Sequence, residues 1–336
     1  MNKQVSSKDV AKEANVSRAT VSYVLNNVDS VKIKPETRQK VLQAAKKLGY
    51  HPNAIARAMK TGQSMSIGVL SNWHIAHQRF TEVLKGVKDV LGRHAYSITL
   101  CSYKSNEQEH PEYYQYYLEK KIDGVILISA RETINEDAVA VIRKKKMPVV
   151  LADFHYNNPT VPCIDIDYHH GGYTAAKYLI EKGHRHFIYL GPKSLALQER
   201  QRISGVKKAF EDVGLNPEEL VQISIEEPNK QDDEDIIDVL KNKGNKSAII
   251  ISNYIIAFNT LYLANKMGIK VPEELAVISL GGSDFAKHSY PRLSTSDLPL
   301  YEMGCRSAQA LLDLINNNGD SVHMSLPCRL NIRETC

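Results

Sequence analysis

The stretch SSKDVAKEANVSRATVSYVLN, residues 6–26, predicts two short helices joined by a tight turn. Ser6 with Asp9 three residues later is typical of a capping box, and the apolar residues that follow recur at helical spacing. Asn15 tolerates the left-handed backbone conformation that a tight turn between helices needs. Ser17 is suited to cap the second helix, which therefore begins directly after it.

The second helix has an inward apolar stripe, formed by Val21, Val24 and Leu25. Its first outward residues are then Arg18, Ala19, Ser22 and Tyr23. This is the layout of a helix-turn-helix, in which the second helix enters the major groove with its N-terminal residues against base edges. A plain helical bundle would show the same pair of capped helices, so the surrounding sequence must decide between them.

The charge distribution favours nucleic-acid binding. Residues 1–62 hold 12 Lys and Arg against 4 Asp and Glu, a balance of +8, whereas the whole chain of 336 residues carries only +5. A basic segment joined to a slightly acidic body is expected where one part neutralises phosphates and the rest has no such task. A solvated basic face remains the alternative.

A third amphipathic helix is expected from Pro35 to Gly49, with Val41, Leu42, Ala45 and Leu48 on its inner face. Residues 54–60, AIARAMK, have the composition for about two turns of helix, which is too short to be stable in water without a partner. The folding of this hinge segment can therefore be coupled to binding. An ordinary interdomain linker is the alternative.

From Met65 onward, short β-branched runs alternate with helical stretches. The expected strands are 66–70, 96–101, 124–128, 148–152, 163–166, 187–190, 221–225, 248–252 and 275–280. The expected helices are 80–92, 112–121, 135–145, 170–182, 199–213, 232–241, 255–267 and 301–316. This order predicts an α/β fold with two doubly wound parallel halves and a ligand pocket between them.

Bulk properties are those of an ordinary globular protein, with 43% hydrophobic and 24% charged residues. The sequence contains no apolar run of about 18 residues and no signal-peptide pattern, so we expect a cytoplasmic protein. The five cysteines lack metal-site spacing and are expected to be reduced packing residues.

Enzyme and cofactor motifs are weak in this sequence. It contains no GxGxxG fingerprint, no P-loop and no GxSxG, so we expect neither an enzyme nor a cofactor. Histidines pair at 169–170 and at 184 and 186, but without acidic or thiol ligands at a metal-site spacing. We therefore expect no metal.

Several segments, in order, resemble the lac repressor (LacI/GalR) family of bacterial transcription regulators over nearly the whole chain. In the first part they are KDVAKEANVSRATVSYVLNN, TRQKVLQAAKKLGYHPNAIARAMKTG and IGVL. In the second part they are KKIDGVILIS, MPVVLAD, GGYTAAKYLIEKGHRHFIYLGP, RISGVKKAF and PRLSTSDLPLYEMG. The resemblance implies a helix-turn-helix head, a hinge helix and a core like a periplasmic binding protein.

The resemblance also implies DNA contacts by position. Base edges would be addressed by Arg18, Ala19 and Tyr23, and backbone phosphates by Ser17, Thr20, Ser22 and Asn26. The minor groove would be contacted by Asn53, Ala56, Arg57 and Met59. Most family members have Arg where this chain has Tyr23, and Arg reads guanine bidentately, so a different base preference is expected there.

For the effector cleft, the resemblance implies Asp153, Arg202 and Asn253. Departures from the family stand nearby: Tyr254 replaces the usual Asp, and Gly281 and Gly282 replace commonly acidic residues. The mouth of the N-terminal half reads His77-Gln78-Arg79-Phe80.

Two classes of effector fit these departures. An anionic effector such as a sugar phosphate would use Arg202, Arg79 and histidines. A larger neutral sugar would instead stack on Trp73, Phe80 or Tyr254.

The expected domains are a head over residues 1–50, a hinge over 51–63 and an effector-binding and dimerisation core over 64–336. The N-subdomain of the core would comprise about 64–161 and 292–320, and the C-subdomain about 162–291 and 321–336. The expected function is an effector-controlled, operator-binding repressor that acts as a homodimer, paired to a tetramer in some family members. The rivals are a cytoplasmic small-molecule binding protein of the transport type and, less favoured, an α/β enzyme.

Overall fold

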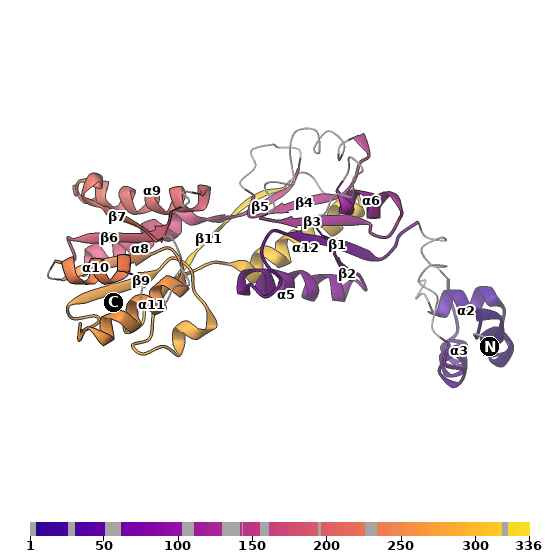
Figure 1. Cartoon of the computed structure of the whole chain (residues 1–336). Coiled ribbons are helices and arrows are strands. Elements are labelled where there is room, and N and C mark those ends of the chain that lie inside the picture. Colours follow the sequence, from indigo (N-terminus) through magenta and orange to yellow (C-terminus); the bar gives the residue numbers. More distant parts are fainter. Residues whose placement is uncertain are drawn as a thin grey trace.

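A computed structural model describes residues 5–25, 31–50, 62–102, 111–129, 142, 144–154, 161–193, 196–225, 234–244, 246–317 and 322–336. Figure 1 shows a small helical head and two larger lobes, each with a sheet between helices. The expected fold class, a helix-turn-helix head followed by two doubly wound α/β halves, is confirmed. The hinge segment 54–60 and nearly all of the expected helix 135–145 lie outside the described residues.

The head consists of α1 (Ser7–Glu13), α2 (Arg18–Leu25) and α3 (Pro35–Lys47). Its core is small and apolar, built from Val10, Ala11, Ala14, Val21, Val24, Val41, Ala44 and Ala45. The expectation for Leu42 was wrong, because this side chain is 49% exposed and Ala44 lies inside instead. Val41, Ala44 and Ala45 share one face at helical spacing, and Leu42 lies one residue off that face.

The first lobe is a parallel sheet in the order β11-β5-β4-β3-β1-β2. Its strands are β1 (Ser66–Ser71), β2 (Ser97–Leu100), β3 (Gly124–Ile128), β4 (Val149–Ala152), β5 (Cys163–Asp167) and β11 (His323–Pro327). Its helices are α5 (Gln78–Arg93), α6 (Glu112–Leu118) and α12 (Leu300–Ile315). Alternate residues of β3 face opposite layers, so the strand is buried on both sides.

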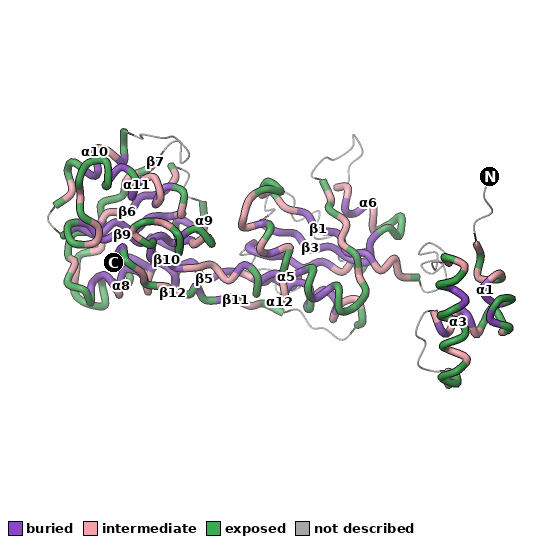
Figure 2. The backbone as a smooth tube through the Cα atoms, turned by 90° about the horizontal axis from the view of Figure 1, so that it is seen from below, coloured by how far each residue is buried: buried purple, intermediate pink, exposed green. Residues whose placement is uncertain are grey.

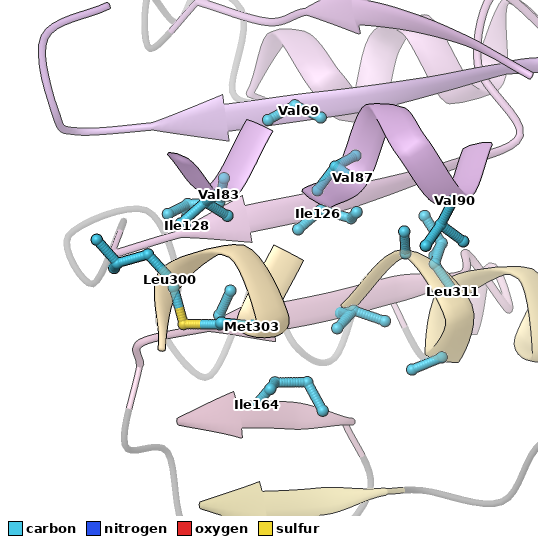
Figure 3. Packing of buried hydrophobic residues seen from close by; sticks show 14 of the residues in the cluster. Val69, Val83, Val87, Val90, Ile126, Ile128, Ile164, Leu300, Met303 and Leu311 are labelled. Atoms are coloured by element: carbon cyan, nitrogen blue, oxygen red, sulfur yellow. The ribbon is translucent and has the colours of Figure 1, made fainter. Parts of the chain in front are cut away.

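One face of this sheet is covered by α5 and α12 (Figure 3). Val83 and Val87 of α5 and Met303 of α12 pack against the strands. The two helices touch through their backbones, since a Cβ added at Gly86 would lie 2.1 Å from the Tyr301 carbonyl oxygen. Only glycine permits an approach this close.

The second lobe is a sheet in the order β12-β10-β9-β8-β6-β7, parallel except for the β10–β12 pair. Its strands are β6 (Phe187–Pro192), β7 (Val221–Ile225), β8 (Ser247–Ile251), β9 (Leu275–Ser279), β10 (Ser294–Asp297) and β12 (Arg329–Asn331). Its helices are α8 (Tyr168–Glu181), α9 (Leu197–Glu211), α10 (Glu234–Asn242) and α11 (Tyr254–Lys266), with short turns η2 (Pro217–Glu219) and η3 (Asp284–Lys287). The sheet lies between α8 and α9 on one face and α10 and α11 on the other.

The burial of a strand depends on whether it lies at the centre or at the edge of its sheet (Figure 2). The central strands β3, β4, β8 and β9 are buried along their whole length, whereas the edge strands β2 and β7 are largely exposed. An edge strand has a sheet neighbour on one side only, which explains the difference.

The chain passes between the lobes three times, after β5, after β10 and after β11. We expected these crossings at about residues 161/162, 291/292 and 320/321, and each falls later, after Asp167, Asp297 and Pro327. The strands β10, β11 and β12 were not predicted, because they are short and their sheet membership depends on pairing partners distant in sequence. The crossings matter for function because a pocket forms beside them.

Candidate nucleic-acid interface and effector cleft

The first helix and the turn of the head have the predicted geometry. The expected capping box is present: the Ser6 amide donates to Asp9 Oδ2 at 2.9 Å, and the Asp9 amide faces the Ser6 side chain. The Ser6 hydroxyl also donates to Asp9 Oδ2, at 2.6 Å. Asn15 has φ +52°, the left-handed conformation predicted for the turn. The Val16 amide then donates to the Ala11 carbonyl at 3.0 Å, so the turn is closed by the backbone.

Ser17 caps the second helix as predicted. Its Oγ accepts from the Thr20 amide at 3.0 Å and lies 2.9 Å from Thr20 Oγ1. This cap fixes the start of α2 and therefore the direction in which Arg18 and Ala19 project. Val21 and Val24 are each 1% exposed and anchor the opposite face.

The predicted DNA-contacting residues at the start of α2 differ in exposure. Ser17, Arg18 and Ala19 are exposed, and Thr20, Ser22 and Tyr23 are partly buried. This arrangement leaves an unobstructed arginine at the helix start, where a major-groove helix places its base contacts. The other predicted contacts lie outside the described residues: Asn26, Asn53, Ala56, Arg57 and Met59.

Between the lobes, the predicted residues Asp153 and Arg202 are linked through a third buried side chain, Tyr168, which was not predicted. Asp153, directly after β4 with φ +58°, is fully buried and accepts from the Tyr168 hydroxyl at 3.0 Å. The Arg202 guanidinium lies over the Tyr168 ring, 4.8 Å from its centroid. Burial, together with the Asp153 carboxylate, raises the pKa of Tyr168 well above its ordinary value, so this hydroxyl stays a hydrogen-bond donor.

Arg202 also contacts a carboxylate that was not predicted. Its Nη1 donates to Glu199 Oε1 at 2.5 Å, and Glu199 Oε2 accepts from the Tyr189 hydroxyl at 2.6 Å. Burial by itself would lower the pKa of Arg202, but the Glu199 carboxylate together with Tyr189, Tyr168 and Cys328 outweighs this effect, and the pKa is raised. The spacing of three residues on one helix was the available signal for this pair.

A pocket of about 430 Å³ opens beside the interlobe crossings. It is lined by residues from α5, α11, α12, the loop before η3 and the crossing segments, among them Arg79, Glu82, Tyr254, Gly282, Asp284, Asp297, Glu302 and Arg329. The sequence suggested that carboxylates are lost from the cleft at Gly281 and Gly282. Other carboxylates reach this pocket, and Asp297 packs so closely on Gly282 that an added Cβ would lie 1.7 Å from its Oδ1.

The predicted effector residues are not all in this pocket. Arg79 and Tyr254 line it, whereas Phe80 is 4% exposed and packs in the core of the first lobe. Trp73 packs against that core and stacks on His77 at 6.2 Å between ring centroids. Asn253 caps α11, where its Oδ1 accepts from the Ile255 and Ile256 amides.

His77 has a structural role at the mouth of the first lobe. Its Nδ1 accepts from the Arg79 amide at 3.2 Å and so caps α5. Burial, with a smaller contribution from Arg79, lowers the pKa of His77. A neutral imidazole that caps a helix is poorly suited to bind an anion.

Over the described residues, no helix is long and apolar enough to cross a membrane. Within the same ranges, no group of three or more acidic, histidine or cysteine side chains could hold a metal ion. All five cysteines are free, as predicted.

Comparisons with known proteins agree with this architecture. Residues 7–53 match the family described as bacterial regulatory proteins, lacI family, and residues 176–336 match the periplasmic binding protein-like domain. The chain is 32% identical to the HTH-type transcriptional regulator RegA of Clostridium saccharobutylicum, covering 92% of each chain.

Two solved structures share the fold over 99% of this chain. One is the lac repressor dimer bound to operator and the anti-inducer ONPF, with a TM-score of 0.79, 22% identity and 99% of that chain covered. The other is the transcriptional regulator CelR–cellobiose complex, with a TM-score of 0.66, 23% identity and 100% of that chain covered. With its helix-turn-helix head and two-lobed core, this chain belongs to the LacI family of bacterial transcriptional regulators.

Proposed function

We propose that this LacI-family regulator is a cytoplasmic repressor that binds a near-palindromic operator, and that a small molecule between the lobes controls its operator affinity. The observation that carries the proposal is the exposed start of α2, Ser17 to Ala19, held by a cap and an apolar core. A rigid helix with an exposed arginine at its N-terminal end is suited to read base edges. The basic balance of residues 1–62 supplies the phosphate attraction.

In this proposal Arg18, Ala19 and Tyr23 read bases, and Ser17, Thr20, Ser22 and Asn26 hold phosphates. The hinge residues Asn53, Ala56, Arg57 and Met59 lie along the minor groove, with Met59 as an apolar wedge. The division is a head over 1–50, a hinge over 51–63 and a core over 64–336. No catalytic role is proposed for any residue.

The ligand would bind between the lobes, in the pocket that Arg79 and Tyr254 line, and would extend to Asp153 and Arg202, which are buried and do not line that pocket. Three chain crossings join the lobes, so a ligand that contacts both would favour one relative orientation. The CelR–cellobiose complex supports a sugar-like ligand, because that regulator binds cellobiose on the same fold.

Dimerisation is proposed through the core. The lac repressor dimer on its operator supports two heads on two half-sites. On this chain, Phe285 and Tyr290 of the second lobe are 68% and 95% exposed, although large aromatic side chains are usually covered. We propose that this segment contributes to the contact between protomers.

Selection from a random DNA pool tests the proposed function. The full-length protein is expected to enrich a near-palindrome with two half-sites, and Tyr23→Arg is expected to change the preferred base at one position of each half-site. Enrichment of no sequence would contradict the proposal. An unchanged preference with Tyr23→Arg would remove the role assigned to Tyr23 and leave the remaining contacts standing.

A further inference from the structure

The Arg202 guanidinium is a buried cation whose charge is already matched within its own helix. Its side chain is 2% exposed, that of Glu199 is 9% exposed, and the two form an ion pair at 2.5 Å. Tyr189 donates a second hydrogen bond to Glu199 at 2.6 Å, so the carboxylate is fixed by two partners. The pair therefore presents no net charge to anything that approaches Arg202.

Arg202 keeps hydrogen-bonding capacity after this pairing. Its Nε and Nη2 are buried and have no hydrogen-bond acceptor in the part of the chain that the structure describes. A guanidinium has five N–H donors, and leaving buried donors without acceptors is unfavourable. The Nε and Nη2 groups of Arg202 are therefore available to a hydrogen-bond acceptor other than Glu199.

The place of Arg202 in the fold points to a ligand as that acceptor. The guanidinium lies on the Tyr168 ring, and the Tyr168 hydroxyl donates to Asp153 of the first lobe. Arg202 therefore stands at the junction of the lobes, beside the first crossing. A ligand reaches such a site when the lobes move apart and is enclosed when they close.

We propose that Glu199 determines the charge of the ligand group accepted at Arg202, restricting it to an uncharged acceptor such as a hydroxyl or carbonyl oxygen. The proposal deepens the proposed function and rests on it for the position of the effector. An anionic group would gain attraction from Arg202 but meet repulsion from Glu199 nearby, and burial strengthens both interactions. The anionic class of effector, which the sequence left open, is thereby disfavoured at this position.

Inorganic phosphate is the probe for the test, because it reports charge selectivity without knowledge of the natural effector. Phosphate binding to the full-length protein is measured by isothermal titration calorimetry for the wild type and for Glu199→Gln, which keeps the side-chain shape. We expect Glu199→Gln to bind phosphate at least tenfold more tightly than the wild type. Equal affinities would overturn the proposal.

A matched control separates this effect from a general gain of positive charge. Arg292 and Glu334 form a second ion pair in the same lobe, at 2.7 Å, but both side chains are exposed. Glu334→Gln removes the same charge and is expected to leave phosphate affinity within threefold of the wild type. A tenfold gain in this control would also contradict the assignment to Glu199.

If Glu199→Gln fails to fold, Glu199→Ala removes the same charge and leaves the Arg202 donors in place. Its phosphate affinity is expected to exceed that of the wild type by at least tenfold. A folded Glu199→Ala protein that binds phosphate no more tightly than the wild type would overturn the proposal. Operator selection is measured separately, so failure of DNA binding is distinguished from failure of charge selection.

Discussion

In the head, Arg18 and Ala19 are exposed on a helix anchored by Val21 and Val24, whereas in the cleft Asp153 is fully buried and Arg202 is 2% exposed. In the head, folding and DNA binding depend largely on different residues: the apolar residues form the core, and the proposed base contacts Arg18 and Ala19 face outward. In the cleft the same polar side chains hold the lobes together and are proposed to bind ligand. Substitution of an outward residue such as Arg18 should therefore affect binding alone, whereas substitution in the cleft should affect stability and binding together. Ser17, which caps α2, is the exception in the head.

The largest expected effect is on the stability of the core. Arg202→Met leaves the buried Glu199 carboxylate without its cation, which typically destabilises a protein by about 3–5 kcal/mol. Thermal unfolding of the full-length protein measures the change, with Arg292→Met in the exposed pair as control. We expect no measurable change in the control. An Arg202→Met protein as stable as the wild type would show that the pair does not support the fold.

The second effect tests how tightly the helices of the first lobe pack. Gly86→Ala places a Cβ against the Tyr301 carbonyl, and overpacking of this kind costs about 1–3 kcal/mol. Gly92 lies on the same helix with nothing near its Cβ position, so Gly92→Ala is expected to stabilise by about 0.5–1 kcal/mol. Urea unfolding is therefore expected to show a lower free energy of unfolding for Gly86→Ala and a higher one for Gly92→Ala. A change in the same direction for both would contradict the close contact between Gly86 and Tyr301.

The third effect is on DNA affinity without a change in stability. Arg18→Ala removes the proposed base contact and is expected to weaken specific operator binding by about 1–3 kcal/mol. Because Arg18 is exposed, the free energy of unfolding should change by less than about 0.5 kcal/mol. Gel shift on the selected operator and thermal unfolding check both parts. If Arg18→Ala lowered the free energy of unfolding as much as it weakened operator binding, Arg18 would support the fold as well as DNA binding.

The smallest effect is expected at the helix cap. Ser17→Ala removes the acceptor of the Thr20 amide, and loss of such a cap typically costs about 1 kcal/mol. Proteolysis of the head at increasing temperature measures the change. Ser17→Asp retains an acceptor and is expected to restore resistance, whereas equal sensitivity of both variants would argue against capping.

The head could be predicted nearly in full from local sequence signals. The capping box at Ser6, the turn at Asn15 and the cap at Ser17 each depend on residues within a few positions. The exception was Leu42, where two adjacent apolar positions competed for one inner face. Most strands and helices of the core followed the same local rules.

The cleft could be predicted only in part, because its geometry depends on contacts between distant segments. Asp153 and Tyr168 lie fifteen residues apart along the chain and meet across the first crossing. Asn253 was expected to bind ligand, which stays a prediction, but an Asn before a helix is also a cap, and its Oδ1 does cap α11. Sequence spacing alone could not distinguish the two roles.

The division of tasks between head and core is tested most directly by the salt dependence of DNA binding. Operator affinity is measured over a series of salt concentrations for the full-length chain and for residues 63–336. We predict that the full-length protein loses affinity steeply as salt rises, because basic residues of the head release counterions, and that residues 63–336 do not bind. Salt-insensitive binding by the full-length protein, or operator binding by residues 63–336, would contradict the account.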